Sequence, residues 1–290
     1  MDDVSGRQIL RPQINFPIEY PRMRTLLLLT IVASCNSVNA QQTSEADVKP
    51  VPVQVRVAAT TPADDSNLLA PYREAAEKKW SKAIAEFDKR NQSEKAPANA
   101  IMFIGSSSIR RWTTMATDMA PYATIRRGYG GAKYTDMGVF VERIVSPHRY
   151  RALVMFVGNG VVGKQEDHTP DQIEALTRHI VATSHKHQPD APVFLIEITP
   201  CESRFSAWPK IRSVNARLRE VALSTPNTYF IPTASHYLKS DGTPRSELFV
   251  SDKLHLSEAG YKLWSSLIRK RLDDVLRAMA AEAAAPADAK

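Results

Sequence analysis

From about residue 70 onward, short apolar runs alternate with longer amphipathic stretches. The clearest run is 100–104, whose unbroken hydrophobicity is typical of a strand buried on both faces. Between such runs, apolar residues three and four positions apart indicate amphipathic helices. We expect strands at 100–104, 123–126, 152–157, 193–198 and 228–231, and helices at 71–90, 137–144, 170–187, 211–223 and 259–280. This alternation predicts an α/β domain with a parallel sheet and helices on both faces.

The same pattern divides the chain into segments. Residues 41–69 are polar, contain prolines and lack periodicity, which predicts a disordered linker. Residues 70–278 carry the alternating pattern without an internal repeat, so we expect one domain there. Residues 279–290 are rich in alanine, and we expect this tail to fray.

The N-terminal extension, residues 1–40, contains a secretory signal pattern that begins at Met23. A basic residue precedes an apolar stretch at 26–33, which is too short to span a bilayer, and small residues follow it. Cleavage after Ala40 satisfies the small-x-small rule. The 22 residues before Met23 are unusual for an export signal, and initiation of translation at Met23 would explain why the signal pattern begins there. The alternative to a signal peptide is that the apolar stretch at 26–33 forms a buried strand or helix.

The two cysteines bear on the compartment and on disulfide formation. Cys35 ends the sequence Val-Ala-Ser-Cys, which loosely resembles a bacterial lipobox. A lipid anchor at Cys35 is therefore the alternative to free secretion, and both readings predict a secreted or periplasmic protein. Cys201 is the only cysteine in the predicted domain, so packing must stabilise it without an intramolecular disulfide.

Composition and charge narrow the class of protein. Hydrophobic residues make up 43% of the chain and charged residues 24%, as in ordinary globular proteins. The net charge of +7 comes from 38 basic and 31 acidic residues that are interspersed, with basic runs no longer than three residues. This favours a solvated surface, and we expect no nucleic-acid partner. No stretch of the domain is long enough for a membrane span, and its histidines lack metal-ligand spacing, so no metal is expected.

Two short segments carry residues suited to nucleophilic catalysis. Ser107 follows the 100–104 strand within Gly-Ser-Ser-Ser-Ile, at the end of the strand where α/β proteins bind ligands. A helix-capping serine is the alternative. Asp252 stands three residues before His255, just ahead of the last predicted helix. A serine hydroxyl needs a base, and the base needs a partner that fixes its tautomer, so this pair supplies both functions.

Together these motifs, Gly-Ser-Ser-Ser-Ile-x-x-Trp and Asp-x-x-His, resemble those of the SGNH (GDSL-like) hydrolases, in the branch related to platelet-activating-factor acetylhydrolase. The resemblance implies that Ser107 is the nucleophile and that Asp252 and His255 complete a triad. It also implies a flavodoxin-like three-layer α/β/α sandwich with a five-stranded parallel sheet.

The resemblance further implies an oxyanion hole formed by Gly131 and Asn159. Gly131 ends Arg-Gly-Tyr-Gly-Gly, which is similar to the second block of the family. The third block departs from the family pattern Gly-x-Asn-Asp, because the chain reads Val157-Gly158-Asn159-Gly160. A different register would leave Gly160, which has no side-chain amide, in the donor position.

From this resemblance we expect a serine esterase that hydrolyses short-chain, acetyl-type esters of a carbohydrate or lipid through an acyl-enzyme, without a cofactor. The alternative is a catalytically weak or inactive protein that uses the same crevice to bind a carbohydrate or lipid. The altered third block supports this alternative, and the intact Ser107, Asp252 and His255 argue against it.

Overall fold

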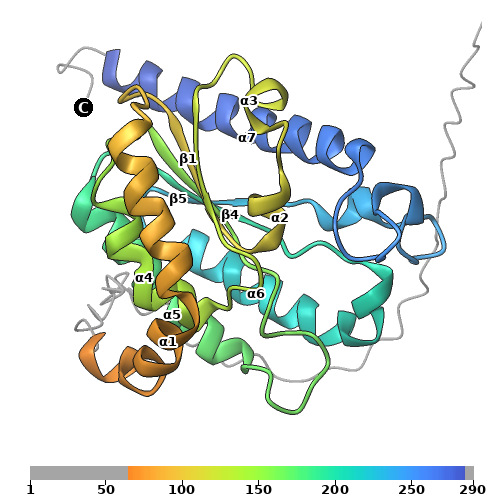
Figure 1. The fold of residues 1–290 in the computed structure, drawn as a ribbon. Coiled ribbons are helices and arrows are strands. Elements are labelled where there is room, and N and C mark those ends of the chain that lie inside the picture. The colour runs from red at the N-terminus through yellow and green to blue at the C-terminus, as the bar shows by residue number, and fades with distance from the viewer. Residues whose placement is uncertain (1–64, 285–290) are drawn as a thin grey trace, which may run out of the picture. The chain divides into compact units, whose positions relative to one another are not determined.

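A five-stranded, wholly parallel sheet forms the centre of the protein in a computed structural model that describes residues 65–284 (Figure 1). The signal pattern at Met23, Cys35 and residues 41–64 of the predicted linker lie outside the described residues. The strands are β1 (Ile101–Gly105), β2 (Thr124–Gly128), β3 (Ala152–Phe156), β4 (Val193–Ile196) and β5 (Thr228–Ile231), in the order β2-β1-β3-β4-β5. Because the strands are parallel, their carboxyl ends share one edge of the sheet.

Helices cover both faces of this sheet, which confirms the predicted three-layer sandwich (Figure 1). One face carries α1 (Asp65–Ser93), α4 (Tyr134–Val145), α5 (Pro170–His187) and α6 (Trp208–Ser224). The other carries α2 (Ser107–Arg111), α3 (Met115–Asp118) and α7 (Glu258–Ala284). Three short 3-10 segments, η1 (Glu202–Ala207), η2 (Ala234–Tyr237) and η3 (Ser246–Leu248), lie in the connections that follow β4 and β5.

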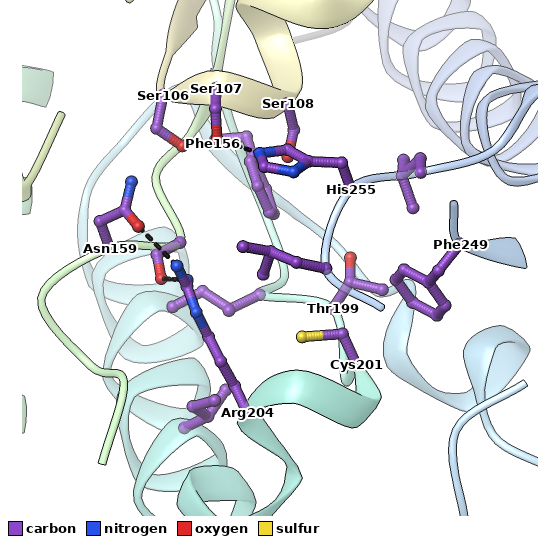
Figure 2. Close-up of a pocket in the computed structure, with 15 residues that line it drawn as sticks. Ser106, Ser107, Ser108, Phe156, Asn159, Thr199, Cys201, Arg204, Phe249 and His255 are labelled. Atoms are coloured by element: carbon purple, nitrogen blue, oxygen red, sulfur yellow. Dashed lines mark hydrogen bonds between the residues drawn. The ribbon is translucent and has the colours of Figure 1, made fainter. Parts of the chain in front are cut away.

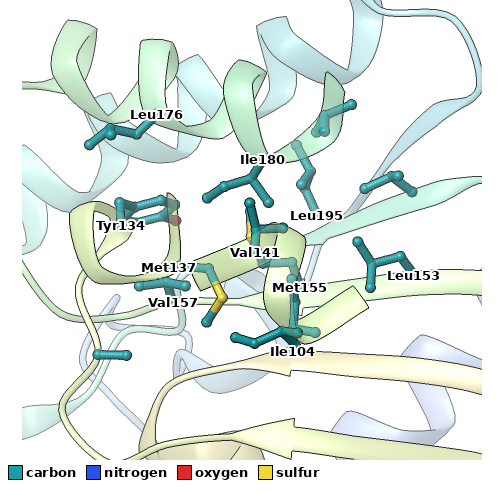
Figure 3. Packing of buried hydrophobic residues seen from close by; sticks show 14 of the residues in the cluster. Ile104, Tyr134, Met137, Val141, Leu153, Met155, Val157, Leu176, Ile180 and Leu195 are labelled. Carbon is teal, nitrogen blue, oxygen red and sulfur yellow. The ribbon is translucent and has the colours of Figure 1, made fainter. Parts of the chain in front are cut away.

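Strands β1, β3 and β4 are apolar throughout because each face of the sheet has its own core. Along β1, Met102 and Ile104 join the cluster under α4 and α5, whereas Ile101 and Phe103 join the cluster under α7. Figure 3 shows the first of these clusters, in which α4 and α5 side chains pack on β1, β3 and β4. This explains why these three strands are unbroken hydrophobic runs in the sequence, whereas β2, at the edge of the sheet, contains Arg126 and Arg127.

Local sequence also fixes where α5 begins. Thr169 accepts a hydrogen bond from the Gln172 backbone N–H (3.2 Å), and the Gln172 side chain accepts one from the Thr169 N–H (2.9 Å). Pro170 occupies the first turn, where its missing N–H costs nothing. This capping box explains why the predicted and observed bounds of α5 agree.

Several predicted helix ends differ from the structure, and two of them change the limits of the domain. Helix α1 begins at Asp65, within the predicted linker 41–69, and continues through Pro71. Leu69 is buried at 4% exposure and packs on α4, where a Cβ at Gly138 would lie 3.0 Å from its Cδ2 atom. Burial of this leucine extends the helix beyond the start that Pro71 suggests.

At the other end, α7 continues to Ala284, although 279–290 was expected to fray. The high helix propensity of alanine accounts for the extra turn. None of the helices within 65–284 combines the length and the apolar character that crossing a membrane requires.

Candidate active site

A glycine at the end of β1 places Ser107 on the carboxyl edge of the sheet. Gly105 has φ +149°, and a Cβ at this position would lie 2.0 Å from the carbonyl oxygen of Phe156 on β3. Only glycine fits so close to the neighbouring strand. The Ser106 N–H then donates to that carbonyl (3.0 Å), and α2 begins at Ser107.

The loop before α7 brings an imidazole to this serine. His255 Nε2 lies 2.9 Å from Ser107 Oγ, and His255 Nδ1 lies 2.6 Å from Asp252 Oδ2 (Figure 2 shows the first contact). The carboxylate can only accept, so it fixes the neutral imidazole with its proton on Nδ1. Nε2 is then free to accept the Ser107 hydroxyl proton. The structure thus joins the three residues of the predicted triad in one hydrogen-bonded chain.

The loop also keeps Asp252 ionised. Burial favours the neutral carboxyl, but hydrogen bonds from the backbone N–H (2.9 Å) and side chain of His255 and from the Leu254 N–H (3.0 Å) outweigh it. Together they lower the pKa of Asp252 to about 2. Arg111, at the end of α2, has its Nη1 atom 3.7 Å from Asp252 Oδ2. The partner of His255 is therefore an anion at neutral pH.

Helix α7 supports the helix that carries the nucleophile. The Tyr261 hydroxyl donates to the Ser108 carbonyl (2.8 Å). The ring of Trp112, just after α2, stacks on Tyr261 with centroids 5.5 Å apart. Trp112 is fully buried, and its Nε1 donates to Asp118 on α3 (2.7 Å). These contacts hold α2, and with it Ser107, against the rest of the fold.

The triad opens onto a small pocket (Figure 2). The volume open to the centre of a water-sized group is about 30 Å³. The pocket is lined by Ser106, Ser107, Ser108, Phe156, Gly158, Asn159, Ile198, Thr199, Cys201, Arg204, Ile211, Phe249, Leu254, His255 and Leu256. Serine hydroxyls and His255 form one side, and Arg204 and Cys201 extend along the opposite side (Figure 2).

Of the two predicted oxyanion residues, Asn159 lines this pocket and Gly131 does not. Asn159 Nδ2 donates to the Ala132 carbonyl (3.2 Å), and a parallel bridge pairs Asn159 with Lys133. Gly131, with φ +84°, lies in the turn immediately before these residues. Gly160, the alternative donor position, is also absent from the pocket lining, which favours the register with Asn159.

Three residues that follow β4 line the pocket: Thr199, Cys201 and Arg204. Arg204 donates to Asn159, and Thr199 has a buried hydroxyl without a hydrogen-bond partner among residues 65–284; the sequence analysis predicted neither. Both come from irregular backbone before α6, where no periodicity or motif marks them. Cys201 lies beside them, and burial raises the pKa of its thiol above the usual value despite hydrogen bonds from Ser203 and Arg204. A thiol that stays neutral fits its expected structural role.

Comparisons with known proteins now identify the family. The model of the GDSL-like Lipase/Acylhydrolase family matches residues 102–263, more than half of the chain. The chain belongs to this family. This GDSL-like protein is accordingly an SGNH-type carboxylic ester hydrolase. A comparison with curated protein sequences gives no significant match.

Solved structures share the fold of this GDSL-like hydrolase at low sequence identity. A Streptococcus pneumonia protein with the provisional name platelet activating factor matches with a TM-score of 0.57 and 20% identity, over 71% of this chain and 95% of that chain. A GDSL-like lipase from Bacteroides thetaiotaomicron matches with a TM-score of 0.57 and 16% identity, over 66% and 98%. A provisionally named acylhydrolase from Bacteroides fragilis gives 0.56 and 21%, over 65% and 94%.

Proposed function

We propose that this hydrolase is a serine esterase that removes short, acetyl-type acyl groups from a carbohydrate or lipid through an acyl-enzyme. The observation that carries the proposal is the continuous chain from Ser107 Oγ through His255 to the Asp252 carboxylate. A hydroxyl, a base and an anion in this order are the arrangement that activates a serine for attack on an ester carbonyl.

In the proposed reaction, His255 takes the proton of Ser107 as Oγ bonds to the ester carbonyl carbon. The resulting oxyanion is held by the Ser107 N–H, in the first turn of α2, and by the Asn159 amide. We include the Gly131 N–H as the third donor because its turn is tied to Asn159 through the Ala132 carbonyl. His255 then protonates the leaving alkoxide, and a water activated by the same imidazole releases the acid.

The pocket supports a short acyl group. A volume of about 30 Å³ for the centre of a water-sized group leaves room for a methyl group beside the carbonyl. The apolar side chains of Ile198, Leu254 and Leu256 line it.

The test is hydrolysis of p-nitrophenyl acetate by purified residues 41–290, compared with the Ser107→Ala variant and with p-nitrophenyl palmitate as substrate. We expect turnover of the acetate that disappears in Ser107→Ala, and at least a hundredfold preference for the acetate in kcat/KM. A folded wild-type protein that turns over neither ester would contradict the proposal and favour the binding protein.

We also propose that the hydrolase is exported, on the strength of the signal pattern that begins at Met23. Mass spectrometry of the mature N-terminus after expression in a bacterium with intact export tests this. A terminus at Gln41 supports free secretion, and an acylated Cys35 supports the lipoprotein. A terminus at Met1 would overturn both.

A further inference from the structure

Arg204, which lies on a different element from Asn159, forms a hydrogen bond with the Asn159 amide that the proposed reaction uses. Arg204 lies in η1, after β4, and its guanidinium extends to the segment after β3 (Figure 2). Nη1 donates to the Gly158 carbonyl at 2.7 Å, and Nη2 donates to Asn159 Oδ1 at 2.8 Å. Two such bonds from one planar group fix both the backbone and the side chain of this segment.

These contacts determine which way the Asn159 amide faces. A guanidinium can only donate, so the atom beside Arg204 must be the amide oxygen. The Ala132 carbonyl can only accept, so the atom 3.2 Å from it must be the amide nitrogen. A flipped amide would oppose donor to donor and acceptor to acceptor. The usual ambiguity between the oxygen and nitrogen of an asparagine is thus resolved by chemistry.

The orientation leaves one N–H of Asn159 for the reaction. The amide nitrogen carries two hydrogens, and the Ala132 carbonyl takes one of them. Asn159 lines the same pocket as Ser107 and His255, where an ester carbonyl must lie during attack. The positively charged Arg204 guanidinium beside the amide oxygen also draws electron density from the amide nitrogen, and this strengthens the N–H as a donor.

We propose that Arg204 is the positioning residue of the oxyanion hole, which orients and polarises Asn159 from across the pocket. The inference rests on the proposed function. Gly160, which follows Asn159, brings no side chain to this segment. In this chain a contact from another loop holds the amide in place.

The experiment is a double-mutant cycle of Arg204→Met and Asn159→Ala, with p-nitrophenyl acetate as substrate. Loss of one oxyanion donor lowers kcat by about 10²–10³, and we expect Asn159→Ala to fall in this range. Arg204→Met should lower kcat by about tenfold or more with less than a threefold change in KM. In the Asn159→Ala background, the same Arg204→Met change should lower kcat by less than threefold, because the amide it positions is gone.

Two variants separate positioning from folding. Asn159→Asp keeps an oxygen for Arg204 but replaces the N–H with an oxygen that faces the Ala132 carbonyl. We expect kcat to fall as in Asn159→Ala, while the ion pair with Arg204 keeps the protein folded at the assay temperature, which circular dichroism checks. Arg204→Lys keeps the charge without the fork and should give an intermediate kcat; it also replaces Arg204→Met in the cycle should that variant not fold. Arg212→Met, at an exposed position on α6, is the matched control and should behave as wild type.

The outcomes distinguish the two proposals. Wild-type kcat in Arg204→Met, or an equal loss in both backgrounds of the cycle, would overturn the role of Arg204 and leave the esterase intact. Absence of Ser107-dependent turnover in the wild-type protein would overturn the proposed function and the inference with it.

Discussion

Asp252 illustrates how one loop residue sets the state of the catalytic base. Its carboxylate accepts hydrogen bonds from two backbone N–H groups and from the imidazole, and its pKa of about 2 keeps it charged at neutral pH. Because this pKa lies below the unfolded value of about 3.9, the stabilising contribution of Asp252 is complete above pH 4 and is lost as the pH falls through 2. A fall in activity between pH 7 and pH 4 must therefore come from another group.

Replacing this anion tests its role directly. We expect Asp252→Asn to lower kcat by about 10³–10⁴, because an amide no longer fixes the tautomer of His255 or stabilises the imidazolium. The measurement is p-nitrophenyl acetate turnover at pH 7.5. Asp241→Asn is the control, since Asp241 is exposed and accepts hydrogen bonds from Thr243 in its own turn. Activity near wild type in Asp252→Asn would show that His255 works without it.

The unpartnered hydroxyl in the pocket leads to a stability prediction. Thr199 is 9% exposed, and its Oγ1 has no hydrogen-bond partner among residues 65–284. Thr199→Val replaces the hydroxyl with a methyl group of similar size, and we expect the free energy of unfolding to rise by about 1 kcal/mol. Urea denaturation measures it.

The matched control for this change is Thr177→Val on α5. The Thr177 hydroxyl is fully buried but donates to the Ile173 carbonyl at 2.7 Å, so its loss should lower the free energy of unfolding by about 1 kcal/mol. A lower stability in Thr199→Val as well would mean that the Thr199 hydroxyl is satisfied in solution.

The residues of the site were predictable to different extents. Ser107 stands directly at a strand end, and Asp252 and His255 share one short motif, so the pairing of these motifs and the family resemblance they carry predicted that the three residues meet. Arg204 stands eight residues after the last residue of β4, in a segment with non-helical backbone angles (φ −127°, ψ 17°). Its contact with Asn159 depends on the path of that loop, which no periodicity encodes.

At the scale of elements, the first turn of α1 belongs to the domain and not to the predicted linker. Leu69 on α1 is buried against α4 and α5, and its truncation would leave a cavity. We expect Leu69→Ala to lower the free energy of unfolding by about 2–3 kcal/mol, measured in urea. Leu223→Ala is the control, because Leu223 is 78% exposed and should change stability by less than about 0.5 kcal/mol. Equal effects of the two changes would contradict the docking of this turn.

The elements differ in how well sequence anticipates their ends. The five strands and α5 were predicted to within two residues, because apolar runs and a capping box are local signals. The start of α1 depends on tertiary burial of Leu69, which the surrounding polar sequence conceals. The end of α7 depends on alanine propensity, which periodicity ignores. Helices α2 and α3 have five and four residues, too few for a periodic pattern.

At the scale of the whole molecule, a buried histidine couples stability to pH. His148 is 8% exposed, and burial, together with the nearby positive charge of Arg127, lowers its pKa to about 4 against the opposing effect of Glu94. Its folded pKa lies below the unfolded value of about 6.5, so the unfolded chain binds the proton first as pH falls. The stabilising contribution of neutral His148 is therefore complete above pH 6.5 and is lost toward pH 4.

Between pH 6.5 and pH 4, we expect the free energy of unfolding of His148→Gln to decrease by about 1–3 kcal/mol less than that of the wild-type protein. Melting temperatures followed by circular dichroism across this range provide the measurement. His236→Gln is the control, because His236 is exposed and should leave the pH profile unchanged. Parallel profiles for wild type and His148→Gln would show that this imidazole does not titrate differently on folding.

The distance along the chain between Ser107 and His255 has a consequence for biosynthesis. The ribosome adds Ser107 148 residues before it adds His255. Helix α7, whose Tyr261 hydroxyl donates to the Ser108 carbonyl on α2, is made after His255. A nascent or prematurely terminated chain holds a serine with no proton acceptor. The hydrogen-bonded chain from Ser107 to Asp252 is therefore incomplete until the loop that carries His255 has been made, and a chain that ends before His255 should lack the proposed esterase activity.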